Sequence, residues 1–398
     1  MASLTQDRSV SGDRSTTDGV PAGAVLALGT GLFGLGLTVG GYGALVPVLV
    51  DAGVPAATAG AGTSLFLLGQ AVAVLPADRI GRRVAPRTIA SAGFLVAAVG
   101  AAMLATPTLA TALVSRVLVG LGQGAAFVAA MTHVGRRTTG ADTATAQGLL
   151  GAGFTLGFAV GLAATPTAIA TVGPLVPAVV SAVVAGVGAA GSLRLPSSGE
   201  ASVPSLLAYV RALQTPVAAT LALGNAVTFG FLMVAGTWYA DLLSGSSIPT
   251  TAALVGFALA TVAGRAVGGV LAARFGDAAT VGWSFVGQTV VLAGTAVAIA
   301  ADRPLLLAAG VVLTGLGFGV PFGPLFALAF TEIAPDPGVT LVGMLVVGNL
   351  AALVYPWLVG RLLTDTGSFA VGIGAMAVSV GLASVLWLAT VGTGSSGA

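Results

Sequence analysis

Twelve long apolar stretches dominate this sequence and leave few folds open to it. Each is long enough to cross the roughly 30 Å hydrocarbon core of a bilayer, for which a helix needs about 20 residues. The stretches lie at residues 23–50, 57–77, 86–106, 109–132, 144–170, 172–192, 216–243, 250–273, 279–300, 304–331, 338–363 and 368–392. Because 56% of the residues are hydrophobic and only 7% are charged, the chain lacks the polar surface of a soluble protein. We therefore predict an all-α membrane protein with twelve transmembrane helices.

The two halves of the chain repeat one another. Arg79 and Arg274 both stand in an Arg-x-Gly triplet and lie 195 positions apart. The segment 120–124, Gly-Leu-Gly-Gln-Gly, is matched at the same offset by 315–319, Gly-Leu-Gly-Phe-Gly. Several coincidences at one offset indicate an internal duplication. We predict two parallel six-helix pseudo-repeats, with a substrate site between them near the middle of the bilayer.

Composition shifts divide the chain into five predicted segments. A polar, turn-rich start and a Pro- and Ser-rich centre flank the apolar halves. The predicted segments are a disordered cytoplasmic tail (1–21), an N-terminal six-helix domain (22–194), a cytoplasmic linker (195–214), a C-terminal six-helix domain (215–392) and a C-terminal tail (393–398).

The arginines predict the orientation in the membrane, since cytoplasmic loops carry an excess of positive charge. With the N-terminus placed inside, the arginines on the cytoplasmic side are Arg8, Arg14, Arg79, Arg82, Arg83, Arg87, Arg136, Arg137, Arg194, Arg211 and Arg274. Only Arg303 and Arg361 fall outside, while Arg116 and Arg265 lie within helices. We expect a multi-pass protein of the cytoplasmic membrane with both termini inside.

The residue inventory argues against several functions. The chain has no cysteine and a single histidine, so we expect neither a thiol nucleophile nor a metal site. A membrane enzyme would need a nucleophile, metal ligands or paired carboxylates at the same depth in the bilayer, and the sequence offers none convincingly. We therefore expect no catalytic residues, no cofactor and no enzyme activity. Because the basic residues stand in short loops beside membrane spans, we also expect no nucleic-acid partner.

A dense patch of charge follows the second span. Asp78, Arg79, Gly81, Arg82 and Arg83 form a tight turn between two apolar stretches. We interpret it as a gating loop, in which the glycine permits the turn and the arginines lie at the lipid headgroups. The Asp78 carboxylate would face the free backbone N–H groups at the inner end of the eleventh helix. The alternative is that the patch only fixes topology.

A second copy of this loop follows the eighth span. It keeps Gly269, Arg274 and Gly276, which we include among the gating residues. Its acidic position is occupied by Ala273, which has no carboxylate. We therefore expect gating to be asymmetric between the halves.

These features resemble the major facilitator superfamily of secondary transporters over nearly the whole chain. The family's loop signature, Gly-x-Leu-Ala-Asp-Arg-x-Gly-Arg-Arg, is matched from Asp78 to Arg83, although Val74 and Pro76 depart from it. Arg116 with the glycines of 120–124 matches the fourth-helix pattern. The resemblance implies transport of a small solute by alternating access, with a co-transported or exchanged ion, in a monomer embedded in the lipid bilayer.

Arg265 is the strongest candidate for substrate contact. No carboxylate falls in the middle of any span, so the sequence offers a buried positive charge and no obvious proton carrier. A guanidinium suits nitrate, carboxylate or phosphate. Its segment resembles the eighth helix of the nitrate/nitrite and organic-anion branches, although Gln70 stands where the offset of 195 would place the second arginine of nitrate carriers. The alternative is that Arg265 extends to the membrane interface.

Gln70 and four further polar residues complete the predicted substrate site. Arg116 lies about two turns into the fourth helix, where the resemblance associates it with coupling and a structural role is the alternative. Asn225, Asn349 and Tyr42 are candidate cavity residues, or else they make hydrogen bonds between helices. We predict a transporter of a small anion, nitrate-like or organic, and the alternative is a multidrug or metabolite efflux permease.

Overall fold

The computed structural model describes residues 22–54, 56–139, 141–196, 202–244, 246–331 and 338–391. These residues form helices and no strands, and twelve spans are long and apolar enough to cross a membrane. The predicted fold class is therefore confirmed. The predicted tails 1–21 and 393–398, and residues 197–201 of the predicted linker, lie outside the described residues.

The first six spans are built from seven helices and two short 3-10 turns. In chain order they are α1 (Ala22–Gly41), η1 (Tyr42–Ala44), α2 (Leu45–Asp51), α3 (Ala56–Gly81), α4 (Pro86–Ala102), η2 (Met103–Ala105), α5 (Leu109–Gly135), α6 (Ala141–Val172) and α7 (Leu175–Leu193). The short helix α8 (Leu206–Ala212) follows in the connection between the halves. The last six spans are α9 (Pro216–Ser244), α10 (Thr250–Phe275), α11 (Asp277–Ala300), α12 (Pro304–Gly319) with α13 (Phe322–Thr331), α14 (Val339–Thr366) and α15 (Phe369–Thr390).

The tenth span is broken near two prolines. Helix α12 ends at Gly319 and α13 begins at Phe322. Pro321 and Pro324 lack backbone N–H donors, so the helical hydrogen bonds are interrupted at this point. Helix α13 places the side chains of Phe322 and Phe326 in the cavity described below.

Glycines allow the helices within each half to pack with their backbones in contact. A Cβ atom at Gly36 of α1 would overlap the carbonyl oxygen of Phe154 in α6, and one at Gly157 of α6 would overlap that of Phe33. With few charged or hydrogen-bonding side chains available, van der Waals contact between backbones supplies much of the attraction between helices in a bilayer. The predicted packing role of the glycines is thus seen directly at the α1–α6 contact.

The two halves pack with registers that differ by one helical turn. Gly124 of α5 faces the carbonyl of Gln70 in α3, whereas Gly319 of α12 faces that of Thr261 in α10. The two glycines keep the offset of 195, but their partners are 191 positions apart, four residues fewer and about one turn. By packing position, Gln70 therefore corresponds to Thr261. The equivalence of Gln70 with Arg265, expected from the sequence offset, is wrong.

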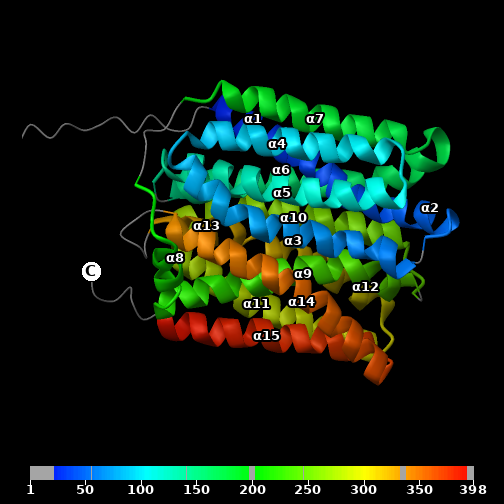
Figure 1. The fold of residues 1–398 in the computed structure, drawn as a ribbon. Helices are drawn as coiled ribbons and strands as arrows, with labels where there is room; N and C mark the ends of the chain where they lie inside the picture. Colours follow the sequence, from blue (N-terminus) through cyan, green and yellow to red (C-terminus); the bar gives the residue numbers. More distant parts are fainter. Residues whose placement is uncertain are drawn as a thin grey trace, which may run out of the picture.

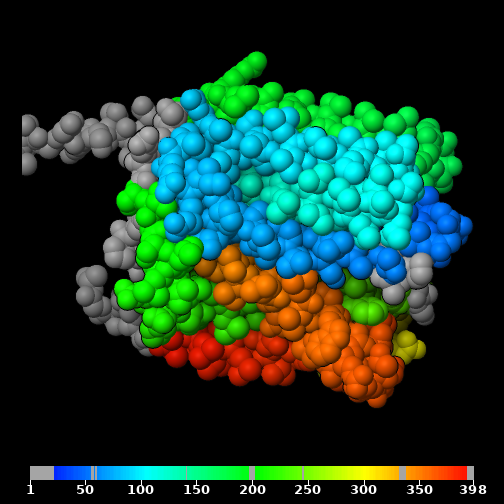
Figure 2. Space-filling model, in the orientation of Figure 1, coloured from blue at the N-terminus to red at the C-terminus, as the bar shows by residue number. Residues whose placement is uncertain are grey.

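The halves meet along three pairs of helices. Helix α6 packs against α10 and α13, and α3 packs against α14. Figure 1 shows α8 at one end of the bundle, the end at which both halves are connected, and α2 at the opposite end. We call these the linker end and the far end. Helices α3 and α14 lie together toward the linker end and diverge toward the far end (Figure 1), where green surface coloured as α9 is visible between them (Figure 2).

Candidate substrate cavity and gate

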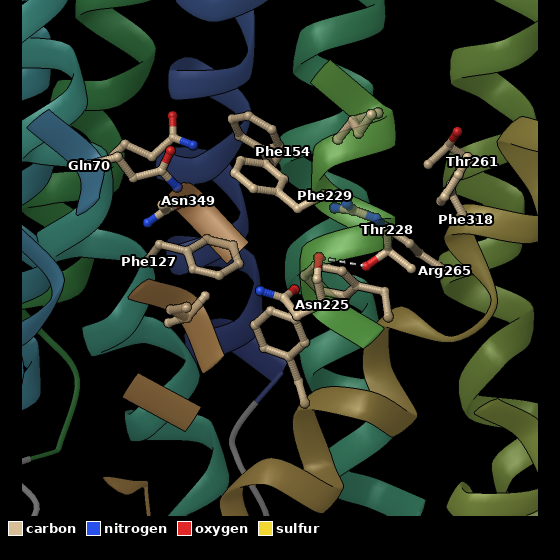
Figure 3. A pocket seen from close by; sticks show the side chains of 15 residues that line it. Gln70, Phe127, Phe154, Asn225, Thr228, Phe229, Thr261, Arg265, Phe318 and Asn349 are labelled. Atoms are coloured by element: carbon tan, nitrogen blue, oxygen red, sulfur yellow. Dashed lines mark hydrogen bonds between the residues drawn. The ribbon is translucent and has the colours of Figure 1, made fainter. Parts of the chain in front are cut away.

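A cavity lies between the halves, in the middle of the bundle (Figure 3). The space between its lining atoms, its open mouth included, measures about 600 Å³. Residues from both halves line it: Gln70, Gln123, Phe127, Phe154, Asn225, Thr228, Phe229, Leu232, Thr261, Arg265, Phe318, Phe322, Phe326, Leu345 and Asn349. The structure thus brings together four of the predicted substrate residues, Arg265, Gln70, Asn225 and Asn349.

Arg265 is the one cation among the described residues that line this cavity. Its side chain is 6% exposed, and the guanidinium lies over the ring of Phe322, 3.9 Å from the centroid. Its Nη1 donates a hydrogen bond to the carbonyl oxygen of Gly151 in α6, across the boundary between the halves. Its Nε is buried and has no hydrogen-bond partner among the described residues. Arg265 therefore points into the protein, and the alternative that it extends to the membrane interface does not hold in this conformation.

Among the described residues, no carboxylate compensates the charge of Arg265. The described lining contains neither an aspartate nor a glutamate, and no described acidic residue forms an ion pair with Arg265. A buried cation with one carbonyl acceptor and one aromatic face keeps much of its capacity to bind an anion. The electrostatics of the cavity thus favour a negatively charged ligand.

Amide side chains form the other polar part of the lining. Gln70, Gln123 and Asn349 are at most 4% exposed, and each has a buried side-chain atom without a hydrogen-bond partner among the described residues. Asn225 differs, because its Nδ2 donates to the carbonyl oxygen of Met344 at 3.0 Å and so ties α9 to α14. Buried polar atoms without partners are costly, and a bound ligand can satisfy them.

Aromatic rings close the cavity on one side. Phe322 and Phe326 of α13 stack with centroids 4.3 Å apart, and Phe127 of α5 meets Phe326 edge to face at 5.8 Å. Since Phe127 belongs to the first half and Phe326 to the second, these rings also seal the boundary between the halves. Nearer the linker end, a Cβ atom at Gly135 would lie 2.8 Å from the ring of Phe330, so the halves touch there as well.

Two predicted substrate residues lie outside this cavity. The guanidinium of Arg116 lies between the rings of Tyr42 and Phe66, 4.4 and 4.6 Å from their centroids, within the first half. Arg116 is 1% exposed, and its Nε and Nη1 have no hydrogen-bond partner among the described residues. The grouping of Arg116 and Tyr42 with the cavity residues is therefore wrong for this conformation.

The phenylalanines of the cavity were not predicted from the sequence. In an apolar span, a cavity-facing ring and a lipid-facing ring look alike. A signal was nevertheless present, because Phe318, Phe322 and Phe326 recur every four residues and so share one helical face on either side of the Pro and Gly break.

The predicted gating residue Asp78 is buried at the linker end. Its Oδ2 accepts hydrogen bonds from Arg82 Nε at 2.8 Å and from the Tyr209 hydroxyl of α8 at 2.7 Å. The partners seen for Asp78 are thus a neighbouring arginine and the connection between the halves, where the sequence predicted the backbone of α14. Burial raises the pKa of the Tyr209 phenol, and the hydrogen bond to Asp78 raises it further, so the phenol remains a donor at neutral pH.

Four arginines of the first half hold the connecting segment by its backbone. Their guanidinium groups donate to main-chain carbonyl oxygens: Arg79 to Pro204 at 2.7 Å, Arg82 to Ser202 at 3.3 Å, Arg87 to Leu195 at 2.8 Å and Arg137 to Pro196 at 3.3 Å. We call Arg79, Arg82, Arg87 and Arg137 the linker clamp. In addition to carrying charge, these arginines fix the path of the chain between the halves.

The other predicted gating residues have different surroundings. Gly81 does not have a positive φ, and a Cβ atom there would make only an ordinary contact with Ile89, so the turn does not require a glycine. Gly276 does require one, since its φ is +84° where α10 ends. Arg83 is exposed, as is Arg274, which lies over the Phe275 ring at 5.2 Å.

Gly269 lies inside α10 and does not belong to a loop. A Cβ atom there would be 2.7 Å from the Cα of Thr145 in α6, so Gly269 lets the two halves approach closely. The second loop has Ala273 at the position of Asp78, so it has no carboxylate there to form a counterpart of the bond with Tyr209. The asymmetric gating expected from Ala273 remains a prediction.

Two groups of six spans around a central polar cavity form the architecture of a secondary transporter. Residues 26–345 match the profile of the Major Facilitator Superfamily, and the chain belongs to that superfamily, whose members are transporters. It is accordingly a multi-pass membrane protein that handles a small-molecule substrate.

Solved structures of this superfamily resemble the chain along nearly its whole length. The human organic anion transporter MFSD10 (TETRAN) superposes with a TM-score of 0.74 at 15% identity, covering 92% of this chain and 100% of its own. The proton:xylose symporter XylE gives 0.75 at 13% (93% and 95%), and the E. coli fucose:proton symporter FucP gives 0.71 at 13% (91% and 97%). At these identities the likeness concerns the fold. A search of curated protein sequences finds no match.

Proposed function

We propose that this protein carries a small organic anion across the cytoplasmic membrane by alternating access, with Arg265 as the charged contact. The observation that supports this most directly is a buried guanidinium in a central cavity whose described lining contains no carboxylate. A desolvated cation attracts an anion strongly because the surrounding dielectric is low. The human organic anion transporter among the structural neighbours is consistent with this class of substrate.

The same lining favours an organic anion over nitrate. A small inorganic anion is best held by several cationic or hydrogen-bonding groups that converge on it. Here a single cation is accompanied by six phenylalanines, whose faces bind apolar surface. The same rings would suit the second candidate function, an efflux permease for apolar compounds. In that case, the rings would bind the substrate and Arg265 would be a structural bridge between the halves.

We propose that the contact between Arg265 and Gly151 links substrate binding to alternating access. In this conformation the guanidinium joins the second half to the first through a backbone carbonyl. An anion that takes over the guanidinium would loosen this bridge, so binding would change the relative stability of the conformations. We propose that the helices before and after α8 move as two domains about the cavity.

We propose that the linker end faces the cytoplasm. The linker clamp and Arg83 all lie at that end, and the positive-inside rule associates such arginines with a cytoplasmic surface. The contacts of Phe330 and Tyr209 lie at the same end. On this proposal, the conformation is closed toward the cytoplasm.

Thermal stabilisation of the purified protein tests the function. A panel of carboxylates and sulfonates, nitrate, neutral sugars and lipophilic cations is added in turn, because a ligand that binds only the folded state raises the melting temperature. We expect organic anions to stabilise the protein and to drive counterflow in proteoliposomes. Stabilisation by lipophilic cations or neutral compounds alone would instead support the efflux permease.

The bond between Tyr209 and Asp78 yields a prediction for the gate. Tyr209→Phe removes only the hydroxyl and should shift the equilibrium toward opening at the linker end by about 1 kcal/mol, roughly fivefold. Because the chain has no cysteine, a single Thr340→Cys reporter can be labelled on a clean background. Thr340 is 1% exposed in the first turn of α14, and its labelling rate should rise about fivefold with Tyr209→Phe. An unchanged rate would show that the bond does not hold the gate.

A further inference from the structure

The polar groups of the cavity are divided between two places. Figure 3 shows Arg265 on one side, near Thr228, and Gln70 with Asn349 on the other. Arg265 belongs to α10, while Gln70 and Asn349 belong to α3 and α14, which pack against each other across the halves. The cavity therefore offers one charged binding point and one separate neutral binding point.

Aromatic rings occupy the space between these two points. In Figure 3, Phe127, Phe154 and Phe229 lie between the amides and the arginine. They come from α5, α6 and α9, so both halves contribute to this apolar middle. A ligand that reached both polar points would have to place an apolar, ring-sized body among these rings, where offset or edge-to-face contacts are favourable.

We infer that the substrate is an aromatic carboxylate with a neutral hydrogen-bonding group, such as a hydroxyl, at the end remote from its charge. This inference rests on the proposed function, since it takes Arg265 as the anion contact, and it adds the ring and the second polar group. The carboxylate accepts from Arg265, whose Nε has no other described partner. The remote group bonds to the amides of Gln70, Gln123 and Asn349.

The chemistry of the amide point selects a neutral group. Each amide side chain can both donate and accept, and the orphan atoms include the acceptors Gln70 Oε1 and Gln123 Oε1 and the donor Asn349 Nδ2. A hydroxyl, which donates and accepts, matches such a set. A second carboxylate or an ammonium group would be buried there without a counter-charge among the lining residues.

A matched series of four probes tests each part of the inference. The probes are acetate, phenylacetate, 4-hydroxyphenylacetate and 2-(4-hydroxyphenyl)ethanol, and apparent affinities come from thermal stabilisation of the full-length protein. Phenylacetate should bind on the order of 100-fold more tightly than acetate, because it buries a ring. The 4-hydroxyl should add about fivefold. The neutral alcohol should bind on the order of 100-fold more weakly than 4-hydroxyphenylacetate.

A variant isolates the amide point. Gln70→Met keeps a side chain of similar size without the amide, and should remove the fivefold gain from the 4-hydroxyl, measured as the ratio of the affinities of this variant for 4-hydroxyphenylacetate and phenylacetate. Gln288→Met is the matched control, since Gln288 of α11 is equally buried, 1% exposed, and does not line the cavity. The control variant should retain the full gain. If a variant fails to fold, the four probes measured on the wild-type protein still test the inference.

The outcomes separate this inference from the proposed function. Equal affinities for acetate and phenylacetate, both dependent on Arg265, would leave the anion carrier intact and overturn the aromatic substrate. Equal affinities for phenylacetate and 4-hydroxyphenylacetate would overturn the second polar group. If the neutral alcohol binds as tightly as the acid, the anion carrier and the inference both fail. Absence of binding by either aromatic acid up to its solubility limit would also overturn the inference.

Discussion

Replacing Arg265 with glutamine should abolish anion-dependent transport while leaving the protein folded. The substitution removes the only cation among the described lining residues and leaves a neutral amide in its place. Loss of a charge-assisted hydrogen bond in a desolvated site costs about 3 kcal/mol or more, which is at least about a 100-fold loss of affinity. Counterflow of a radiolabelled organic anion in proteoliposomes measures this loss directly.

Arg303→Gln is the control for this experiment. Arg303 is exposed at the start of α12 and does not line the cavity. Transport by this variant should stay close to wild type, whereas Arg265→Lys, which keeps charge but loses the planar fork, should retain only part of the activity. Full activity of Arg265→Gln would contradict the proposal and favour the efflux permease, with Arg265 as a structural bridge.

Placing an alanine at Gly36 should destabilise the first half severely. The added methyl group would overlap the Phe154 carbonyl oxygen, so α1 and α6 would have to separate along their whole contact. Overpacking against backbone atoms, which cannot rotate away, costs on the order of 3–5 kcal/mol. The melting temperature of the detergent-solubilised protein should therefore fall markedly, and the yield of folded protein should fall with it.

The same helix supplies the comparison for Gly36. Gly29 also lies in α1, but a Cβ atom there would meet no heavy atom within 4 Å. Gly29→Ala should melt at or slightly above the wild-type temperature, because alanine is the better helix former. Equal melting temperatures for the two variants would show that the α1–α6 contact adapts more readily than its geometry implies.

The positions of the spans could be predicted from the sequence because apolar length alone defines a membrane helix. The break near Pro321 was predictable for an equally local reason, the missing N–H donors. Arg265 and Asn349 could be assigned to the cavity because buried polar groups in a membrane protein must face protein or water.

Other features of the site depend on the rotation and register of whole helices, which local sequence does not determine. Arg116 lies at a reasonable depth for substrate contact but faces Tyr42 and Phe66, away from the cavity. Gly124 and Gly319 are separated by the repeat offset of 195, but the residues that they contact, Gln70 and Thr261, are not. The reason is that α10 packs on α12 in a register one turn away from that of α3 on α5. The bond from Tyr209 to Asp78 joins residues 131 positions apart, and no local pattern connects them.

The linker clamp holds the connecting segment through main-chain carbonyl oxygens, and every residue type provides one. Substitutions at Leu195, Pro196, Ser202 or Pro204 therefore leave the acceptors in place, whereas a change in the number of residues between them would move the acceptors away from the arginines. The segment should tolerate wide variation in composition at a fixed length. During evolution its length would thus be constrained more tightly than its sequence, the reverse of what is usual for a loop between two domains.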